Sequence, residues 1–183
     1  MTHVELVGNA LCLDFANTVN ARPVARRDWL ATAPGATDWA RATGHPIEDP
    51  AGLADTLPAA RDLREAVFRV FQPLARGESA PRADLDAVTA VHADGVAHGR
   101  LEGDDSTFRL SWSAPRTART LLWEVAASTV ELLTQGPLDR LGECPSCCWL
   151  FLDTSKNRRR RWCSMTTCGS RDKSRRYYTT HSS

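Results

Sequence analysis

The stretch that decides the fold is residues 144–176, CPSCCWLFLDTSKNRRRRWCSMTTCGSRDKSRR. Its four spaced cysteines form two pairs, C-x2-C and C-x4-C, with fifteen residues between the pairs: Cys144, Cys147, Cys163 and Cys168. This ligand set and spacing are typical of structural zinc sites with four thiolates. The sequence therefore predicts one structural Zn2+ whose coordination positions are all filled, which argues against a catalytic metal. Four-thiolate iron is the alternative for the same ligands.

The residues around the cysteines predict a small treble-clef-like zinc finger. The first pair fits a tight turn that points both sulfurs inward. Two short strands are expected next, one holding Trp149 and Phe151 and one over residues 160–163, around a turn at 153–157. The second pair leads into a basic segment whose spacing suits a helix. We therefore expect a knuckle, a hairpin and a C-terminal helix.

Positive charge is concentrated in the same segment. Residues 156–176 contain nine lysines and arginines against one acid, Asp172. A rigid small module with so many cations is typical of a phosphate-binding surface. The hairpin arginines are expected to hold phosphates, and those of the last helix to reach guanine edges. The predicted DNA-contacting cations are Arg158, Arg159, Arg160, Arg161, Arg171, Lys173, Arg175 and Arg176.

Three runs of residues carry a family resemblance: Cys144-x-x-Cys147-x-Trp149-x-Phe151-x-Asp153-Thr154-Ser155-x-Asn157, then Arg160-Arg161-Trp162-Cys163-Ser164-Met165, then Cys168-Gly169-x-Arg171-x-Lys173. Together they resemble the CGNR zinc finger of bacterial proteins, which follows an N-terminal domain called ABATE. The run Leu13-Asp14-Phe15-Ala16-Asn17-Thr18 resembles the opening of that domain. The resemblance implies a stress-related transcription regulator whose finger has DNA as its partner.

One position departs from the family pattern. Ser170 stands where the family has the asparagine of its name. Serine keeps an oxygen but lacks the donor and acceptor pair of an amide. If this side chain reads a base, we expect a different sequence preference with unchanged zinc binding. Ser170 therefore joins the predicted DNA-contacting residues.

Charge divides the chain into an acidic body and a basic C-terminal module. Residues 1–143 hold 14 lysines and arginines and 20 acidic residues, a net charge of −6. Residues 144–183 hold nine lysines and arginines and two acidic residues, a net charge of +7. An acidic body is repelled by DNA, so it directs contact to the finger.

Helical periodicity of apolar residues dominates the N-terminal part. It predicts three helices, over residues 56–76, from about 79 to 95 and over 114–135. Alternating apolar residues beside a turn predict a β-hairpin over residues 100–112. The first twenty residues fit both a strand and a helix, and we favour a helix.

These patterns predict an α+β fold in three parts. Residues 1–137 form a mainly helical, ABATE-like N-terminal domain with one β-hairpin, and residues 138–178 form the four-cysteine zinc finger. Residues 179–183 are expected to be a disordered tail. Leu138 and Leu141, in the short linker, are expected to dock the finger on the body.

Asp14 and Asn17 are the polar residues that stand out in the N-terminal domain. They lie three residues apart, so they share one side of a helix. Either they hydrogen-bond to backbone and fix a nearby loop, or they line a pocket for a small-molecule effector. We favour the first role, because polar side chains commonly fix loops in this way.

The sequence predicts a zinc-dependent DNA-binding transcription regulator in which the N-terminal domain senses a ligand or dimerises. No nucleophile–base pairing, Gly-rich phosphate loop or histidine–carboxylate cluster is evident, so we expect no enzymatic activity. A single finger makes a small interface, and a homodimer on two half-sites would increase sequence selection. The alternative is a zinc module that binds RNA or protein without sequence-specific DNA binding.

The chain shows no signal-peptide pattern and no apolar stretch that approaches the length of a membrane span. We therefore expect no membrane partner and a cytoplasmic location. Reduced cysteines agree with that compartment, because four of the six have metal-ligand spacing rather than a disulfide framework.

Overall fold

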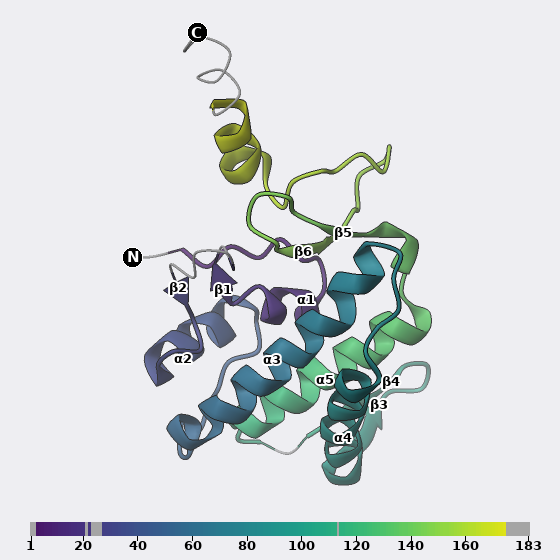
Figure 1. Cartoon of the computed structure of the whole chain (residues 1–183). Coiled ribbons are helices and arrows are strands. Elements are labelled where there is room, and N and C mark those ends of the chain that lie inside the picture. The colour runs from purple at the N-terminus through teal and green to yellow at the C-terminus, as the bar shows by residue number, and fades with distance from the viewer. Residues whose placement is uncertain (1–2, 21, 23–26, 113, 175–183) are drawn as a thin grey trace, which may run out of the picture.

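The computed structural model describes residues 3–20, 22, 27–112 and 114–174, in which a helical body carries the finger at one end (Figure 1). Three long helices build the described part of the body: α3 (Leu53–Ala75), α4 (Arg82–His98) and α5 (Ala118–Gln135). The short helix α1 (Leu11–Ala16) packs against α3 and α5. None of the described helices has both the length and the apolar character needed to cross a membrane.

Short elements complete the fold and confirm the predicted α+β class. Helix α2 covers Ala33–Ala42, η1 is a 3-10 turn at Leu138–Arg140, and η2 is a π-helical turn at Met165–Gly169. The strands pair antiparallel, two by two: β1 (Val19–Asn20) with β2 (Arg27–Asp28), β3 (Arg100–Gly103) with β4 (Phe108–Ser111), and β5 (Leu141–Glu143) with β6 (Leu150–Leu152). The β3–β4 pair is the hairpin predicted over residues 100–112.

Two of the helix ends that differ from the sequence predictions do so for clear local reasons. Helix α4 continues past Gly95 to His98, because Gly95 lies directly against Trp123 of α5. A Cβ at Gly95 would approach the Trp123 side chain to 2.9 Å, so glycine here serves close helix packing rather than helix termination. Helix α5 begins at Ala118 because Thr117 caps it, its hydroxyl accepting a hydrogen bond from the Thr120 N–H.

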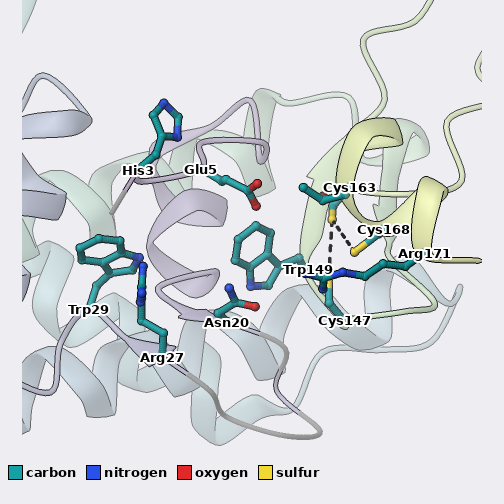
Figure 2. Close-up of a pocket in the computed structure, with 11 residues that line it drawn as sticks. His3, Glu5, Asn20, Arg27, Trp29, Cys147, Trp149, Cys163, Cys168 and Arg171 are labelled. Atoms are coloured by element: carbon teal, nitrogen blue, oxygen red, sulfur yellow. Dashed lines mark hydrogen bonds between the residues drawn. The ribbon is translucent and has the colours of Figure 1, made fainter. Parts of the chain in front are cut away.

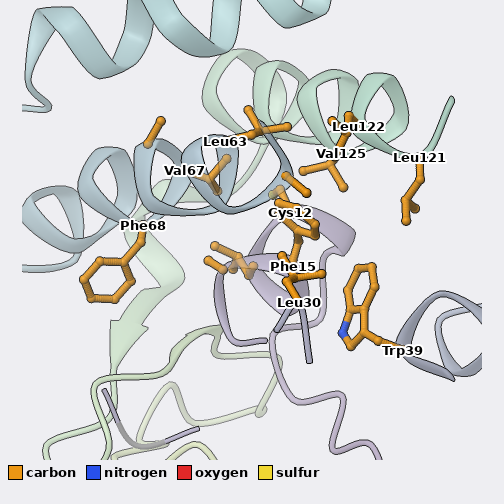
Figure 3. Packing of buried hydrophobic residues seen from close by; sticks show 14 of the residues in the cluster. Cys12, Phe15, Leu30, Trp39, Leu63, Val67, Phe68, Leu121, Leu122 and Val125 are labelled. Atoms are coloured by element: carbon orange, nitrogen blue, oxygen red, sulfur yellow. The ribbon is translucent and has the colours of Figure 1, made fainter. Parts of the chain in front are cut away.

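The core of the body lies between α1, α2, α3 and α5 (Figure 3). Phe15 of α1 meets Trp39 of α2 edge to face, with ring centroids 5.5 Å apart. Cys12 lies beside Phe15 and is fully buried, and this burial raises the pKa of its thiol to about 12. Cys12 therefore behaves as a small apolar core residue rather than as a reactive thiol.

The finger strand β6 belongs to the core of the body as well as to the finger. Leu150 and Leu152 point into the body core, whereas Trp149 and Phe151 point toward the cysteines. This alternation follows from the two-residue period of an extended chain. The docking predicted for the linker is also present, since its leucines pack against the same core: Leu138 and Leu141.

Asn17 holds β6 on the body through both polar atoms of its side-chain amide. Its Nδ2 donates to the Leu150 carbonyl at 2.8 Å, and its Oδ1 accepts from the Leu150 N–H at 2.9 Å. Asp14 acts on the preceding segment, where its Oδ1 accepts from the N–H groups of Val7 and Gly8. The Gly8 carbonyl in turn accepts from Leu152 at 2.9 Å. Both polar side chains thus hold backbone segments, the first of the two roles considered for them.

We predict that Asn17→Ala lowers the free energy of unfolding by about 2–4 kcal/mol, because it leaves the buried N–H and C=O of Leu150 without partners. Chemical denaturation followed by circular dichroism measures this loss. The control is Asn157→Ala in the exposed finger loop, where a change of less than about 0.5 kcal/mol is expected. Equal stability of the two variants would contradict the role of Asn17.

Candidate functional site

The four spaced cysteines converge on one buried cluster at the top of the body. Their sulfur atoms all lie within 4.8 Å of one another. The sulfurs of Cys147 and Cys163 are 3.5 Å apart, and those of Cys163 and Cys168 are 3.6 Å apart. Tetrahedral coordination with zinc–sulfur bonds of about 2.3 Å places neighbouring sulfurs about 3.8 Å apart, whereas a disulfide needs about 2.05 Å. The donor set and its spacing therefore fit one structural zinc ion.

The first ligand pair sits in the turn that joins β5 to β6. The turn closes through the Cys148 N–H, which donates to the Cys144 carbonyl at 2.9 Å, and through the Cys144 N–H, which donates to the Trp149 carbonyl at 2.8 Å. Cys148 adopts a φ of 61°, in the left-handed region that glycine occupies most readily. This backbone conformation turns Cys148 away from the ligand cluster, which explains why the fifth cysteine of the segment is not a ligand.

The second ligand pair flanks the start of η2. Cys163 ends the loop that follows β6, and Cys168 lies inside the helical turn. Ser164 caps this turn, its hydroxyl accepting a hydrogen bond from the Thr167 N–H at 3.4 Å. Helical structure continues from η2 to residue 174. The predicted C-terminal helix is therefore present, and it begins between the two ligands.

The predicted pairing of residues 149–151 with residues 160–163 is wrong. β6 pairs instead with β5, in the register Leu141 opposite Leu152. The cause lies in Asp153, whose carboxylate accepts from the N–H groups of Ser155 and Arg160, each at 2.8 Å. The Ser155 side chain and these two backbone N–H groups lower the pKa of Asp153, and the hydrogen bonds fold the chain into a loop.

The electrostatics of the four-cysteine cluster favour a bound cation. Hydrogen bonds from the thiols of Cys147 and Cys163 lower the pKa of Cys144, and the same pairings with Cys144 raise the pKa of Cys147 and Cys163. One thiolate therefore forms readily, while further ionisation is opposed by the charge already present. A divalent metal stabilises all four thiolates together, so metal binding releases protons and supports the fold.

Comparison with protein families agrees with this geometry. Residues 9–136 match the ABATE family, described as "Putative stress-induced transcription regulator". The chain belongs to the ABATE family. Residues 140–181 match the CGNR zinc finger, so the cysteine cluster is the zinc centre of a CGNR finger. A search of the curated proteins gave no significant match.

Arg160 of the CGNR finger has a structural role that the sequence did not reveal. Its guanidinium stacks on Phe151, 4.4 Å from the ring centroid. It donates to the carbonyls of Val7 at 3.0 Å, Leu152 at 3.3 Å and Trp162 at 3.2 Å, and also to that of Cys163. These contacts tie the loop to the N-terminal segment. They engage donors that the sequence analysis had assigned to DNA, so Arg160 has a structural role within the finger.

The other predicted DNA-contacting residues divide into three groups. Arg158 forms an exposed ion pair with Asp139 at 2.6 Å, and Arg161 stacks on Trp162. Ser170 donates from its hydroxyl to the Met165 carbonyl at 3.1 Å, so it closes the last turn of η2. Three exposed cations form no ion pair with any described residue: Arg159, Arg171 and Lys173. The remaining two lie outside the described residues: Arg175 and Arg176.

The described part of the body contains two histidine–carboxylate contacts, and the one that joins distant parts of the sequence was missed by the motif search. His45 Nδ1 lies 2.8 Å from Glu124 Oε2, although the residues are 79 positions apart. Arg116 bonds to the other oxygen of Glu124, and its backbone N–H donates to Glu48. Both oxygens of Glu124 are thus engaged, and the cluster ties the segment after α2 to α5.

We predict that Arg160→Ala lowers the free energy of unfolding by about 2–4 kcal/mol, since several buried carbonyls lose a charged donor. Arg159→Ala changes an exposed neighbour and is expected to shift stability by less than about 0.5 kcal/mol. Chemical denaturation of both variants measures the difference. Similar stabilities would show that Arg160 is not the tie between the finger and the N-terminal segment.

Cys163→Ser is expected to reduce bound zinc from about one ion per chain to almost none, because the four-thiolate site loses a central ligand. The helical circular dichroism signal should persist, since α3, α4 and α5 pack together without the cysteines. Elemental analysis gives the zinc content. The matched control is Cys148→Ser, which lies outside the cluster and should keep its zinc.

Proposed function

We propose that this ABATE–CGNR chain is a zinc-dependent DNA-binding transcription regulator. The observation that carries the proposal is the distribution of uncompensated charge. Eight arginines of the body form ion pairs with acidic residues: Arg22, Arg41, Arg64, Arg69, Arg76, Arg82, Arg116 and Arg119. In the finger, Arg158 pairs with Asp139, but three exposed cations have no such partner among the described residues and remain available to phosphates: Arg159, Arg171 and Lys173.

The proposed mechanism assigns different tasks to the cations of the finger. Bound zinc holds the knuckle and η2 together, and this keeps the cations on one rigid module. Arg159 and Arg161, in the loop before Cys163, contact phosphates. Arg171 and Lys173, on the helix after Cys168, lie at the surface and approach base edges. Ser170 is exposed beside them, with its hydroxyl directed to the Met165 carbonyl.

The proposal also covers partners and location. One small finger buries too little surface for strong sequence selection, so a homodimer on two half-sites is part of it. A small-molecule effector of the N-terminal domain and a cytoplasmic location complete it. We assign the chain no catalytic activity, because four thiolates fill the metal's coordination sphere.

The alternative is that the finger binds RNA or another protein. Clustered arginines serve RNA equally well, since the phosphate chemistry is the same. Competition between duplex DNA and single-stranded RNA of matched length separates the two. A preference for the RNA would favour the alternative.

Binding of the zinc-loaded protein to genomic DNA fragments at several salt concentrations tests the proposal, with a chelated sample alongside. We expect salt-sensitive binding that selects particular fragments and disappears on chelation. Arg159→Ala should weaken binding to all fragments similarly and lower the salt slope by about one. Arg171→Ala should instead reduce the preference for the selected fragments.

Two results would contradict this scheme. Unchanged binding after chelation or in Cys163→Ser would remove zinc from the mechanism. Equal effects of the two arginine variants on selected and random DNA would remove base reading by Arg171.

A further inference from the structure

A hollow of about 190 Å³ lies where the N-terminal segment, the β1–β2 pair and the CGNR finger meet (Figure 2). We call it the junction hollow. Its lining comes from all three parts, including Glu5, Asn20, Arg27, Trp149 and Arg171. At about 30 Å³ for each water molecule, it holds roughly six waters or one small organic molecule. The zinc ligands form one end of it, so a molecule bound here touches the body and the finger together.

Two indole rings provide the apolar lining of the junction hollow. Trp149 is 5 % exposed, and its Nε1 donates to the Val19 carbonyl at 2.7 Å. The ring is therefore held in place with its polar atom already used, and only its apolar surface faces a ligand. Trp29 is half-buried at the opposite end, where the Arg27 guanidinium lies 5.3 Å from its ring centroid. Such a fixed apolar lining with few polar groups is typical of small-molecule sites.

Polar groups without partners among the described residues line the same space. Figure 2 shows Glu5 and Asn20 on opposite sides of Trp149, with Arg171 reaching in from the finger. Within the described part of the chain, the side chains of these three polar residues form no hydrogen bond or ion pair. Thr167 also lines the hollow, and its buried Oγ1 has no hydrogen-bond partner there. Surrounding atoms cover this hydroxyl, so the polar groups that a ligand in the hollow can reach are those of Glu5, Asn20 and Arg171.

The charges around the hollow restrict the class of ligand. Arg27 and Arg171 oppose a purely cationic molecule. Glu5 opposes a purely anionic one, as does the zinc–thiolate centre, whose four thiolates and one divalent ion leave a net charge of about −2. A ligand that carries one positive and one negative charge can pair with the acidic and the basic groups of the lining. We propose that the junction hollow binds a small zwitterion of the free α-amino-acid class.

The pairing follows from the positions of the lining groups. The carboxylate of the amino acid pairs with the Arg171 guanidinium, and its ammonium pairs with Glu5. Its side chain lies against Trp149. The consequence for regulation rests on the proposed function: Arg171 is also a proposed DNA contact, so a bound amino acid competes for it and lowers DNA affinity. Amino-acid binding itself does not depend on that function.

The test is a titration of the zinc-loaded full chain with each of the proteinogenic amino acids. Tryptophan fluorescence serves as the readout because Trp29 and Trp149 line the hollow, and calorimetry confirms each response. We expect a saturable response to a subset of them. Glu5→Gln should weaken it at least about tenfold, because one charge-assisted contact is lost. The matched control is Glu78→Gln, at an exposed position outside the hollow, which should bind as the unaltered chain does.

Two derivatives of the best amino acid test the ligand class. The amine without the carboxylate and the carboxylic acid without the ammonium should both bind much more weakly than the amino acid. If either derivative bound as tightly as the amino acid itself, the proposal that the ligand is a zwitterion would be overturned. Equal affinity of Glu5→Gln and Glu78→Gln would overturn the proposed site.

DNA binding measured in the same samples separates this inference from the proposed function. If no amino acid produces a response while zinc content and DNA binding are intact, the junction hollow is not an amino-acid site and the regulator proposal stands. If an amino acid binds as described while the chain binds no DNA, the regulator proposal fails and the site stands. Weaker DNA binding on addition of the amino acid, with the effect lost in Glu5→Gln, would support both.

Discussion

The buried amide of Asn17 determines how the two parts of this protein fit together. It satisfies both backbone polar groups of Leu150, a residue 133 positions away, at a place where water has no access. With those groups paired, β6 can place Leu150 and Leu152 in the apolar core of the body at no hydrogen-bonding cost. The finger is therefore part of the body's core rather than a module on a tether. This contact, the alternation of side chains along β6 and the bonds from the finger to Val7, Gly8 and Val19 together fix the position of the zinc centre relative to the helices.

The arginines of the chain divide by role according to what surrounds them. Eight of those in the body pair with carboxylates, and Arg64, only 5 % exposed, pairs with Asp28 at 2.6 Å. Arg160 faces carbonyl groups and an aromatic ring, so its charge organises a loop. Arg159 and Arg171 face solvent. A run of four arginines at 158–161 thus contains an ion pair, an exposed cation, a structural tie and a stacked side chain in succession. Charge density alone predicted a binding surface, but the surroundings decide which cations can serve it.

Local sequence signals were sufficient for the parts of the fold that depend on nearby residues. Cysteine spacing identified the zinc ligands, and helical periodicity located the three long helices. The failures arose where distant residues meet. The donors of Arg160 reach Val7, 153 positions away, and no periodic pattern carries that information. The sequence analysis placed a helix end at Gly95 because glycine is a poor helix former. In the structure, the absence of a side chain at Gly95 leaves room for Trp123. The pairing of β6 was misjudged because the two hydrogen bonds to Asp153 outweigh the strand propensity of the following residues.

The shared core has a consequence for the proposed regulation of the finger by the N-terminal domain. An ABATE domain joined to its finger by a flexible linker would influence DNA binding only through local concentration. Here the N-terminal segment contacts the finger through Val7 and Gly8, and β1 contacts it through the carbonyl of Val19. A change in the packing of these segments therefore acts on Trp149 and on the loop that holds Arg160 without passing through a hinge. Coupling of this kind requires only a difference in free energy between two arrangements of one core.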